Sequence, residues 1–347
     1  MSRYDAIVVG LGTMGTAAAY HLARRGRRVL GIEQFGIVHD RGSMHGETRI
    51  IRLAYHEHPD YVPLLRRAYE LWRELDPSLL HIVGSLDVGP EDGFVVAGAL
   101  RACREHGLRY ELVRPSAVRV PRGHVAVFQP DGGYVEAERS VHAHAQAARA
   151  AGATLLTGEP VLDWSSSGNG VEVVTEAGVY ETDRLVLCPG AWAAELLHLP
   201  PKLFVAERQT IAWFDAPGLA AAPVFIVEED DDDSNYYGIA AGGRVKVGRM
   251  HADDIEVLRD FARRRLPEAG ELLESQTCLF TNTPDHHFVL GLHPHATNVV
   301  VASACSGHGF KFAPVVGEIL ADLALEGSTR HEIAFLELER LLVRKGQ

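Results

Sequence analysis

Near its N-terminus the chain carries the stretch Tyr4-Asp5-Ala6-Ile7-Val8-Val9-Gly10-Leu11-Gly12-Thr13-Met14-Gly15, which runs through an alanine-rich segment to Val29-Leu30-Gly31-Ile32-Glu33. A β-type apolar run, Gly-x-Gly-x-x-Gly, a helical segment over residues 13–25 and a second apolar run ending in an acid follow one another in the order of a βαβ unit. Gly10 permits the tight turn, Gly12 lets backbone N–H groups approach a pyrophosphate, and Gly15 lets the helix pack on the strand. Glu33 is placed to accept hydrogen bonds from a ribose diol, so the sequence predicts a dinucleotide-binding domain.

Length, composition and charge limit the class of protein. The 347 residues are 46% hydrophobic, which is enough for two domains with their own cores. A net charge of −12 argues against general binding to nucleic acid or to an anionic membrane surface, because both need a basic surface. The first residues lack the layout of a signal peptide, and the apolar segment after them carries glycines, a histidine and arginines. We therefore expect a cytoplasmic protein.

The cysteines and histidines give no metal-binding or disulfide pattern. The four cysteines (Cys103, Cys188, Cys278 and Cys305) are widely scattered, without a CxxC pair. The 18 histidines include no HExxH arrangement. We expect no metal site and no disulfide scaffold.

Periodicity along the rest of the chain indicates an α/β fold with a second, inserted domain. Helical spacing is found over residues 61–75, 92–106, 138–151, 253–265 and 313–326. Short strands with turns, at 209–214, 224–227, 236–240 and 244–248, are typical of an antiparallel sheet with one face toward a site. The predicted class is a Rossmann-like dinucleotide-binding domain over residues 1–80, 138–202 and 276–340. A mostly antiparallel substrate domain of the α+β type is predicted over residues 81–137 and 203–275.

Two charged segments need an explanation. Arg49 and Arg52 are three residues apart, which places both guanidinium groups on one side of a helical turn, where they can face one anion. The alternative is a solvated helix start. The six consecutive carboxylates at 228–233 predict a solvated loop, because like charges resist packing. If this loop overhangs the entrance to a site, it disfavours anionic substrates there.

Three further places fit a cofactor. An apolar strand at 298–303 leads into Cys305-Ser306-Gly307-His308-Gly309-Phe310-Lys311-Phe312 and a helix with Pro314 early in it, so the helix N-terminus can face an electron-rich ring edge. Val161, at the end of a second βα unit, can lie near the adenine. Gly190, just past a strand, suits either close backbone approach to a ligand or a plain turn.

Taken together, these motifs resemble the monomeric sarcosine oxidase and N-methyltryptophan oxidase family, within the D-amino acid oxidase-like flavoproteins. Three segments carry the resemblance: the N-terminal βαβ unit, His45-Gly46-Glu47-Thr48-Arg49-Ile50-Ile51-Arg52, and Ser306-Gly307-His308-Gly309-Phe310-Lys311-Phe312. Cys278-Leu279-Phe280-Thr281-Asn282-Thr283-Pro284-Asp285 is a fourth, and the similarity runs over essentially the whole chain.

The resemblance implies FAD, held by a thioether from the flavin 8α-methyl group to Cys278. A buried strand thiol is the alternative for Cys278, and Cys305 is a rival anchor. The expected cofactor contacts are Gly10, Gly12, Gly15, Glu33, Gln34, Ser43, His45, Thr48, Arg49, Val161, Gly190, Cys278, Gly307, His308, Gly309 and Lys311.

The resemblance also implies roles in catalysis. Arg52 and Lys311 match the pair that binds the substrate carboxylate, and Lys246 matches the lysine that assists oxygen reduction through water. His45 and Arg49 match residues beside the flavin ring, and Tyr237 matches an active-site tyrosine. Two departures affect the substrate pocket. Arg249-Met250 precede His251, so either a bulge returns His251 to the pocket or Met250 replaces it, and Phe280 stands where sarcosine oxidase has a tyrosine.

The expected function is therefore an FAD-dependent oxidase of N-methyl or other secondary α-amino acids. It would transfer hydride to flavin, form an imine and reduce O2 to H2O2. Its partners would be a small amino-acid substrate and O2, with no nucleic acid or membrane, and the protein would be a monomer. The alternatives are a D-amino acid or glycine oxidase or a dehydrogenase on the same fold, a flavoprotein subunit that needs a partner, and a dehydrogenase that uses nicotinamide alone.

Overall fold

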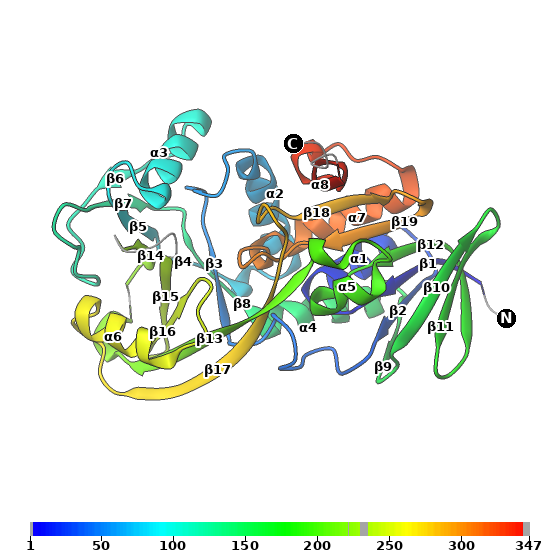
Figure 1. Ribbon diagram of the computed structural model, residues 1–347, viewed down its shortest axis with the longest axis horizontal. Coiled ribbons are helices and arrows are strands. Elements are labelled where there is room, and N and C mark those ends of the chain that lie inside the picture. The colour runs from blue at the N-terminus through cyan, green and yellow to red at the C-terminus, as the bar shows by residue number, and fades with distance from the viewer. Residues whose placement is uncertain (1–2, 221, 230–234, 343–347) are drawn as a thin grey trace. The chain divides into compact units, whose positions relative to one another are not determined.

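The chain folds into two compact units, which each contain several separate segments (Figure 1). The computed structural model describes residues 3–220, 222–229 and 235–342. The first unit contains the chain up to His45, Ala137–Glu207 and the chain from Leu279 onward, and the second contains Gly46–Glu136 and Arg208–Cys278. The boundary after His45 differs from the predicted one, which kept residues 46–80 with the first domain. These residues belong to the second unit because two of their strands pair with a strand at residues 133–136.

The first unit is built on a mostly parallel sheet, as predicted. Its parallel strands, in spatial order, are β9 (Thr154–Thr157), β2 (Val29–Glu33), β1 (Tyr4–Val9), β12 (Val179–Leu187) and β19 (Ala296–Ser303). A hairpin of β10 (Val161–Ser167) and β11 (Gly170–Thr175) pairs with the first part of β12. The antiparallel strand β18 (Val289–His293) extends the sheet beside β19. Strand β18 was not among the predicted strands, because its short apolar run contains a glycine and is flanked by histidines.

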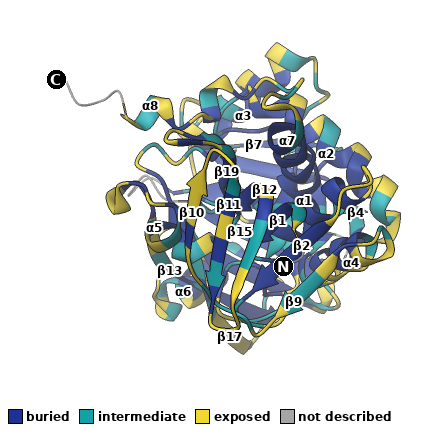
Figure 2. Cartoon of the chain, turned by 90° about the vertical axis from the view of Figure 1, so that its right-hand side faces the viewer, coloured by how far each residue is buried: buried dark blue, intermediate teal, exposed yellow. Residues whose placement is uncertain are grey.

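Three helices of the first unit pack together: α1 (Thr13–Ala23), α4 (Ala137–Ala150) and α7 (Ala313–Glu326). An ideal Cβ on Gly317 would lie 2.6 Å from the carbonyl carbon of Ala17, so this glycine allows α7 to approach α1 backbone to backbone. In Figure 2, α7 is buried along most of its length, whereas β10 and β11 carry many exposed residues. Two further short helices, α5 (Ala193–Leu196) and α8 (Glu339–Leu342), belong to this unit.

The second unit contains the antiparallel-rich sheet that the sequence predicted. Its spatial order is β17 (Leu272–Asn282), β13 (Val205–Asp215), β16 (Arg244–Arg249), β15 (Asn235–Ala241), β14 (Val224–Glu228), β5 (Ser85–Gly89), β7 (Val125–Gln129) and β6 (Glu111–Leu112). β14 pairs with β5 in parallel, and the pairs β13–β16, β15–β16, β14–β15, β5–β7 and β6–β7 are antiparallel. A small sheet of β3 (Thr48–Ile51), β8 (Gly133–Glu136) and β4 (Leu80–Ile82) and the helices α2 (Tyr61–Leu75), α3 (Phe94–His106) and α6 (Ile255–Arg265) complete this unit.

The predicted helical turn at Arg49 and Arg52 is wrong. Residues Thr48–Ile51 form strand β3, in which Arg49 lies opposite Val135 of β8. Arg52 comes directly after this strand, so the segment is extended and the helical spacing that would place both guanidinium groups on one side does not apply. The alternative of a solvated helix start is also wrong, because Arg52 is only 1% exposed.

The predicted solvated loop at residues 228–233 is wrong for its first two acids. Glu228 ends β14, and its carboxylate accepts hydrogen bonds from the backbone N–H groups of Phe94 and Val95 at the start of α3. Glu229 is buried and accepts two hydrogen bonds from Arg264 and one from Arg265, at 2.6–2.9 Å. Ion pairing to α6 thus overcomes the like-charge repulsion that motivated the prediction. Asp230–Asp233 lie outside the described residues.

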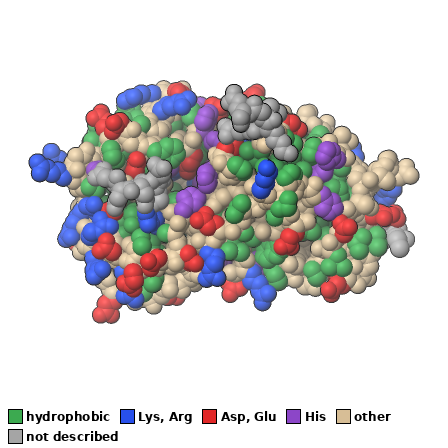
Figure 3. Space-filling view, in the orientation of Figure 1, with side chains coloured by type: hydrophobic (Ala, Val, Ile, Leu, Met, Phe, Trp, Pro, Cys, Tyr) green, Lys and Arg blue, Asp and Glu red, His purple; other side chains and the backbone are tan. Residues whose placement is uncertain are grey.

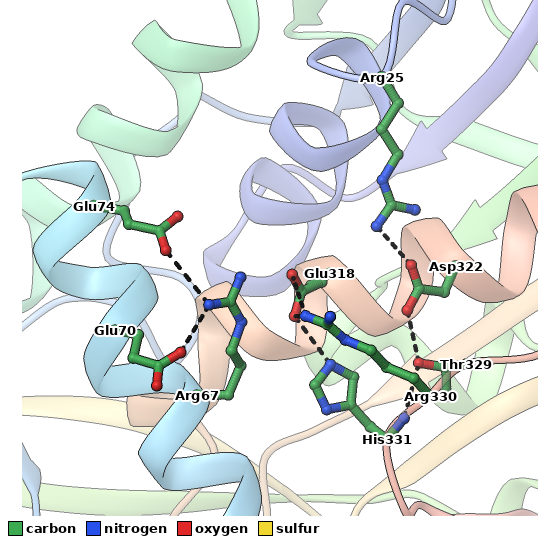
Figure 4. Close-up of polar contacts among 9 residues, drawn as sticks. All are labelled: Arg25, Arg67, Glu70, Glu74, Glu318, Asp322, Thr329, Arg330 and His331. Carbon is green, nitrogen blue, oxygen red and sulfur yellow. Dashed lines mark hydrogen bonds and ion pairs between the residues drawn. The ribbon is translucent and has the colours of Figure 1, made fainter.

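Two acids of α7 fix the chain that follows this helix. Glu318 accepts a hydrogen bond from the ring of His331, at 2.9 Å. Asp322 is bound by Arg25 of the α1–β2 connection and by the Thr329 hydroxyl, and both sets of contacts can be followed in Figure 4. Another network in the same figure, within the second unit, joins Arg67 of α2 to two glutamates one and two turns further along that helix. On the face shown in Figure 3, the Lys and Arg side chains of the described residues are interspersed with Asp and Glu side chains.

Two buried histidines, His21 in α1 and His144 in α4, predict destabilisation in acid. Burial, with a contribution from the neighbouring His144, lowers the pKa of His21 from 6.5 to about 3, and burial lowers the pKa of His144 from 6.5 to about 4. Because the folded-state pKa lies below the unfolded-state value, the neutral form's contribution to stability is fully present above pH 6.5. It is lost as the pH falls from there toward the folded-state pKa.

We therefore expect the free energy of unfolding to fall by about 2 kcal/mol per buried histidine between about pH 7 and about pH 5. Denaturant titrations at both pH values measure this change. His144→Asn should flatten the dependence, whereas His142→Asn, at an exposed position of the same helix, should leave it intact. Equal slopes for the wild type and His144→Asn would show that burial of this ring is not the cause.

Candidate cofactor and substrate site

The glycine-rich turn after β1 has the geometry that the βαβ pattern predicts. Gly10 has φ +84°, and a Cβ there would lie 2.3 Å from the carbonyl oxygen of Cys188. A Cβ on Gly15 would lie 1.8 Å from the carbonyl oxygen of Gly10. A Cβ on Gly12 would lie 3.2 Å from the terminal methyl of Met44. Gly12 therefore faces the end of a flexible side chain, whereas Gly10 and Gly15 face backbone atoms. The first and third glycines therefore hold the turn closed, and the middle one leaves it open on one side.

Glu33, at the end of β2, is tied to the same turn. One carboxylate oxygen accepts a 2.8 Å hydrogen bond from the backbone N–H of Leu11, and the other accepts one of 3.0 Å from Phe35. The side chain is 5% exposed. Each carboxylate oxygen can accept more than one hydrogen bond, so these contacts orient the acid and leave acceptor capacity for a ribose hydroxyl.

The second glycine-rich loop, between β19 and α7, is held by the chain before β18. Ser306 has φ +42° and Gly307 φ +75°, and a Cβ on Gly309 would lie 1.8 Å from the carbonyl oxygen of Ala304. The His308 ring contacts the carbonyl oxygen of His286 at 3.0 Å. Lys311 is 6% exposed and donates a 2.8 Å hydrogen bond back to the His308 carbonyl oxygen. The loop therefore presents a buried cation at a fixed place.

In the second unit, the structure brings five predicted site residues together: Thr48, Arg49, Tyr237, Lys246 and Cys278. Lys246 is 2% exposed, and its ammonium donates to the carbonyl oxygens of Gly46, at 2.8 Å, and of Thr48. Arg49 also donates to the Thr48 carbonyl oxygen, at 2.8 Å. Two cations thus converge on one turn of the backbone.

Tyr237 belongs to this group through strand pairing and through its electrostatic surroundings. It lies opposite Gly248 in the β15–β16 pair, and a Cβ on Gly248 would be 2.3 Å from the Tyr237 hydroxyl oxygen. Burial and the nearby Cys278 raise the pKa of Tyr237, and Arg49 partly offsets this increase. Gly248 is therefore required for the tyrosine to lie across β16, and Tyr237 stays a neutral hydrogen-bonding group.

Arg52, which follows β3, is the most buried of the predicted cations. Its guanidinium donates to the Ala54 carbonyl oxygen and to Glu57 Oε2, the latter at 2.6 Å, and lies 4.6 Å from the centre of the Tyr55 ring. Its Nε atom is buried without a hydrogen-bond partner in the described residues. A buried donor of this kind favours an acceptor from a ligand.

The cysteines differ in their environments. Cys278 is buried on β17, and Cys305 Sγ accepts a 3.3 Å hydrogen bond from the Thr281 N–H. Burial raises the pKa of Cys188 to about 12, and burial, together with Asp87, raises that of Cys103 to about 12. Both of these thiols stay protonated and unreactive, which leaves Cys278 and Cys305 as the two candidates that the sequence named.

The remaining predicted residues are scattered over loops and strand ends. His45 is buried, and Gln34 and Ser43 are partly buried. Val161 begins β10 and packs on the apolar cluster beneath the parallel sheet, and Gly190 is exposed with open space at its Cβ position. His251 is exposed with φ +60°, whereas Met250 is partly buried and its N–H extends the β15–β16 pairing to Asn235. These positions stay predictions.

The residues of the first unit fit FAD. Helix α1 has eleven residues, and no side-chain hydrogen bond caps its N-terminus at Gly12, so its first N–H groups are available to a pyrophosphate. The open side of Gly12 and the oriented Glu33 flank that terminus. FAD would be held here by the turn, the helix N-terminus and the acid, and it would supply the two-electron redox chemistry that protein side chains lack.

Fold and site together define a flavin-dependent oxidoreductase. The family model of FAD dependent oxidoreductases matches residues 5–323. The monomeric sarcosine oxidase of Streptomyces avermitilis is 40% identical, over 97% of this chain and 98% of that protein. The N-methyl-L-tryptophan oxidase of Salmonella arizonae is 33% identical, over 97% and 99%. The chain belongs to the FAD-dependent oxidoreductases, and within them to the family of monomeric sarcosine oxidases and N-methyltryptophan oxidases.

A solved structure agrees with this assignment. The open form of NikD, described as an unusual amino acid oxidase essential for nikkomycin biosynthesis, matches with a TM-score of 0.85 and 29% identity, over 97% of this chain and 98% of that chain. In the described part of this chain, none of the helices has the length and apolar character needed to span a membrane.

Sequence reasoning missed the groups that surround Arg52. Glu57 forms an ion pair with it, and Asp87 and His56 lie in the same buried region. The only signal was Asp87 alternating with apolar residues in the strand Ser85–Gly89, a pattern that usually places the polar residue in solvent. In this structure the face of β5 that carries Asp87 is buried, so the alternating pattern alone predicts a solvent-exposed Asp87 incorrectly.

Proposed function

We propose that this protein is an FAD-dependent oxidase of N-methyl or other secondary α-amino acids. The relatives named for sarcosine and N-methyl-L-tryptophan supply the substrate class. The observation in this chain that carries it is Arg52, a guanidinium that is 1% exposed and keeps a buried Nε donor without a partner in the described residues. A planar, permanently charged donor in a dry environment is suited to an α-carboxylate. Bound FAD would supply the two-electron oxidation at the carbon next to nitrogen with O2 as the final acceptor, so that the products are an imine and H2O2.

The chain's own residues would bind and orient the substrate. Arg52 is proposed as the carboxylate-binding residue of the second unit and Lys311 as that of the first unit. Tyr237 would donate a hydrogen bond as a neutral hydroxyl. The functional division of the chain follows: the first unit would hold FAD, and the second would supply most of the substrate contacts.

Turnover with a panel of amines tests this function. Purified protein should consume O2 and form peroxide with sarcosine, N-methyl-L-tryptophan or L-proline, and much less with glycine or D-alanine. Preference for the primary amines would favour a glycine or D-amino acid oxidase. Flavin reduction by substrate without O2 consumption would favour a dehydrogenase, and no reduction by any amine would favour a subunit that requires a partner.

Lys246 is proposed to assist the reaction with oxygen. A buried ammonium near the flavin would stabilise the negative charge that forms when O2 is reduced. The supporting observation is that two backbone carbonyl oxygens hold it in place at 2% exposure. Lys246→Met should slow flavin reoxidation by O2 by about tenfold or more, with reduction by substrate nearly unchanged. Equal reoxidation rates for this variant and the wild type would remove the assignment.

Covalent attachment of FAD through Cys278 is a further part of the proposal. Acid precipitation should leave the yellow colour in the pellet of the wild type and of Cys305→Ser, and release it to the supernatant for Cys278→Ser. If Cys305→Ser releases the colour and Cys278→Ser retains it, the attachment site is Cys305. Colour released from the wild type would show that the cofactor is not covalently bound.

We also propose that the protein is a monomer and that it is located in the cytoplasm. Sedimentation would test the first proposal, and cell fractionation would test the second.

A further inference from the structure

A fully buried carboxylate, Asp87, is linked to Arg52 through His56 and Glu57 and has no role in the function described so far. It belongs to β5, where Leu86 and Val88 face the apolar core of the large sheet and Asp87 faces the other way. Its side chain is 0% exposed, and neither carboxylate oxygen has a hydrogen-bond partner in the described part of the chain. Burying a charge this completely is costly unless nearby opposite charge compensates it. The groups around Asp87 therefore decide what it does.

The groups that face Asp87 from the Arg52 side are the ring of His56 and, beyond it, Glu57 and Arg52. His56 Nδ1 lies 3.8 Å from Asp87 Oδ1 and His56 Nε2 lies 3.7 Å from Glu57 Oε2, so the imidazole sits between the two acids. Burial alone would lower the pKa of the Arg52 guanidinium, but Glu57 and then Asp87 raise it, and the net shift is upward. Val127, the cross-strand neighbour of Asp87, packs against the apolar residues Val96 and Leu100 of α3. The site is dry, so electrostatic interactions within it are weakly screened.

Asp87 acts on Arg52 through its charge and does not position the Arg52 side chain. The Arg52 side chain is positioned by the Ala54 carbonyl oxygen, the Glu57 carboxylate and the Tyr55 ring, and no hydrogen bond joins it to Asp87. Loss of the Asp87 charge should therefore leave the geometry of the guanidinium intact and change only the electrostatic potential that a ligand meets there.

We propose that Asp87 sets the strength and charge selectivity of anion binding at Arg52. The inference rests on the proposed function, because it assumes that Arg52 binds the substrate carboxylate. The carboxylates of Glu57 and Asp87 reduce the positive electrostatic potential that a ligand meets at the Arg52 guanidinium. Amino acids with one carboxylate can bind and leave, and molecules with a second carboxylate are disfavoured. Asp87 is thus a specificity-determining residue that acts through charge at a distance.

The test compares anion affinities in the holoenzyme of Asp87→Asn, which keeps the shape of the side chain and removes its charge. Flavin absorbance changes report the binding of propionamide, propionate and malonate, which carry zero, one and two negative charges. We expect affinity for propionate to rise by on the order of tenfold, affinity for malonate to rise by more, and affinity for propionamide to stay the same. The KM for sarcosine should fall while kcat stays within about twofold.

Controls separate a charge effect from a structural one. Glu105→Gln removes an acid from an exposed ion pair on α3 of the same unit and should leave all three affinities unchanged. Asp87→Ser provides a second neutral variant should Asp87→Asn fail to fold, and it should shift the three affinities in the same direction. Equal or weaker binding of both anions to a folded neutral variant would overturn the proposal, as would equal gains for all three ligands.

Failure of the proposed function gives a different result. Arg52→Gln should weaken propionate binding whether or not Asp87 matters. If Arg52→Gln leaves propionate affinity unchanged, the carboxylate role of Arg52 is wrong. If Arg52→Gln weakens binding and the neutral Asp87 variants change nothing, that role stands and the inference about Asp87 is wrong.

Discussion

Replacing Arg52 with glutamine will lower kcat/KM for secondary amino acids by roughly thirtyfold to several thousandfold, because removing one partner of a desolvated charge pair costs roughly 2–5 kcal/mol. The guanidinium is 1% exposed, and glutamine restores neither its charge nor its forked donor geometry. Steady-state kinetics with sarcosine measures the loss. Most of it should appear in KM if the contact is equally strong in the ground and transition states.

A matched control is available on the following helix. Arg66 is exposed on α2 and donates a hydrogen bond to the His106 carbonyl oxygen, so Arg66→Gln changes the same side chain outside the site. It should retain wild-type kinetics. The double variant Arg52→Gln/Glu57→Gln removes the acid that would otherwise lose its partner, and it shows how much of the effect arises from that acid. An Arg52→Gln enzyme with full FAD content and unchanged kcat/KM would refute the assignment.

Alanine at Gly15 will abolish retention of FAD. The added Cβ would lie 1.8 Å from the Gly10 carbonyl oxygen, and because both groups are backbone at a tight turn, the turn must open to accept it. Overpacking that forces the backbone to shift costs about 1–3 kcal/mol, and occasionally more. Since the same turn presents the N-terminus of α1, the pyrophosphate site is lost along with the packing.

Flavin content after purification, read from the ratio of flavin to protein absorbance, measures this effect. Gly168→Ala is the control, because a Cβ at that exposed position meets no atom within 4 Å. The control should remain yellow and the Gly15→Ala protein should be colourless. A Gly15→Ala protein with the full flavin complement would show that the turn is not the pyrophosphate site.

Local sequence signals predicted the elements that local interactions determine. The predicted bounds of α2 and α7 match the structure, because apolar periodicity ends at a recognisable stop: Asp76-Pro77 after α2 and Gly327, with φ +73°, after α7. The βαβ unit was predictable for the same reason, since its turn, helix and strands lie within thirty-odd residues. Contacts of this range are encoded by neighbouring residues.

The errors arise where distant segments decide the outcome. Spacing alone made Arg49 and Arg52 fit a helical turn, but pairing with β8, far along the chain, makes that segment a strand. Glu229 is buried because α6 supplies two arginines to it, and nothing near Glu229 in the sequence indicates this. Asp87 alternates with apolar residues as a solvent-facing acid would, and only the packing of α3 over β5 reveals that it is buried.

Anaerobic mixing of the purified protein with sarcosine, followed by its flavin absorbance, tests the central claim most directly. If the protein is an oxidase of secondary amino acids, the yellow absorbance will be lost in a single turnover and will return when O2 is admitted, with one peroxide formed per flavin. If neither sarcosine nor any other N-methyl or cyclic amino acid reduces the flavin, the proposed substrate class is wrong.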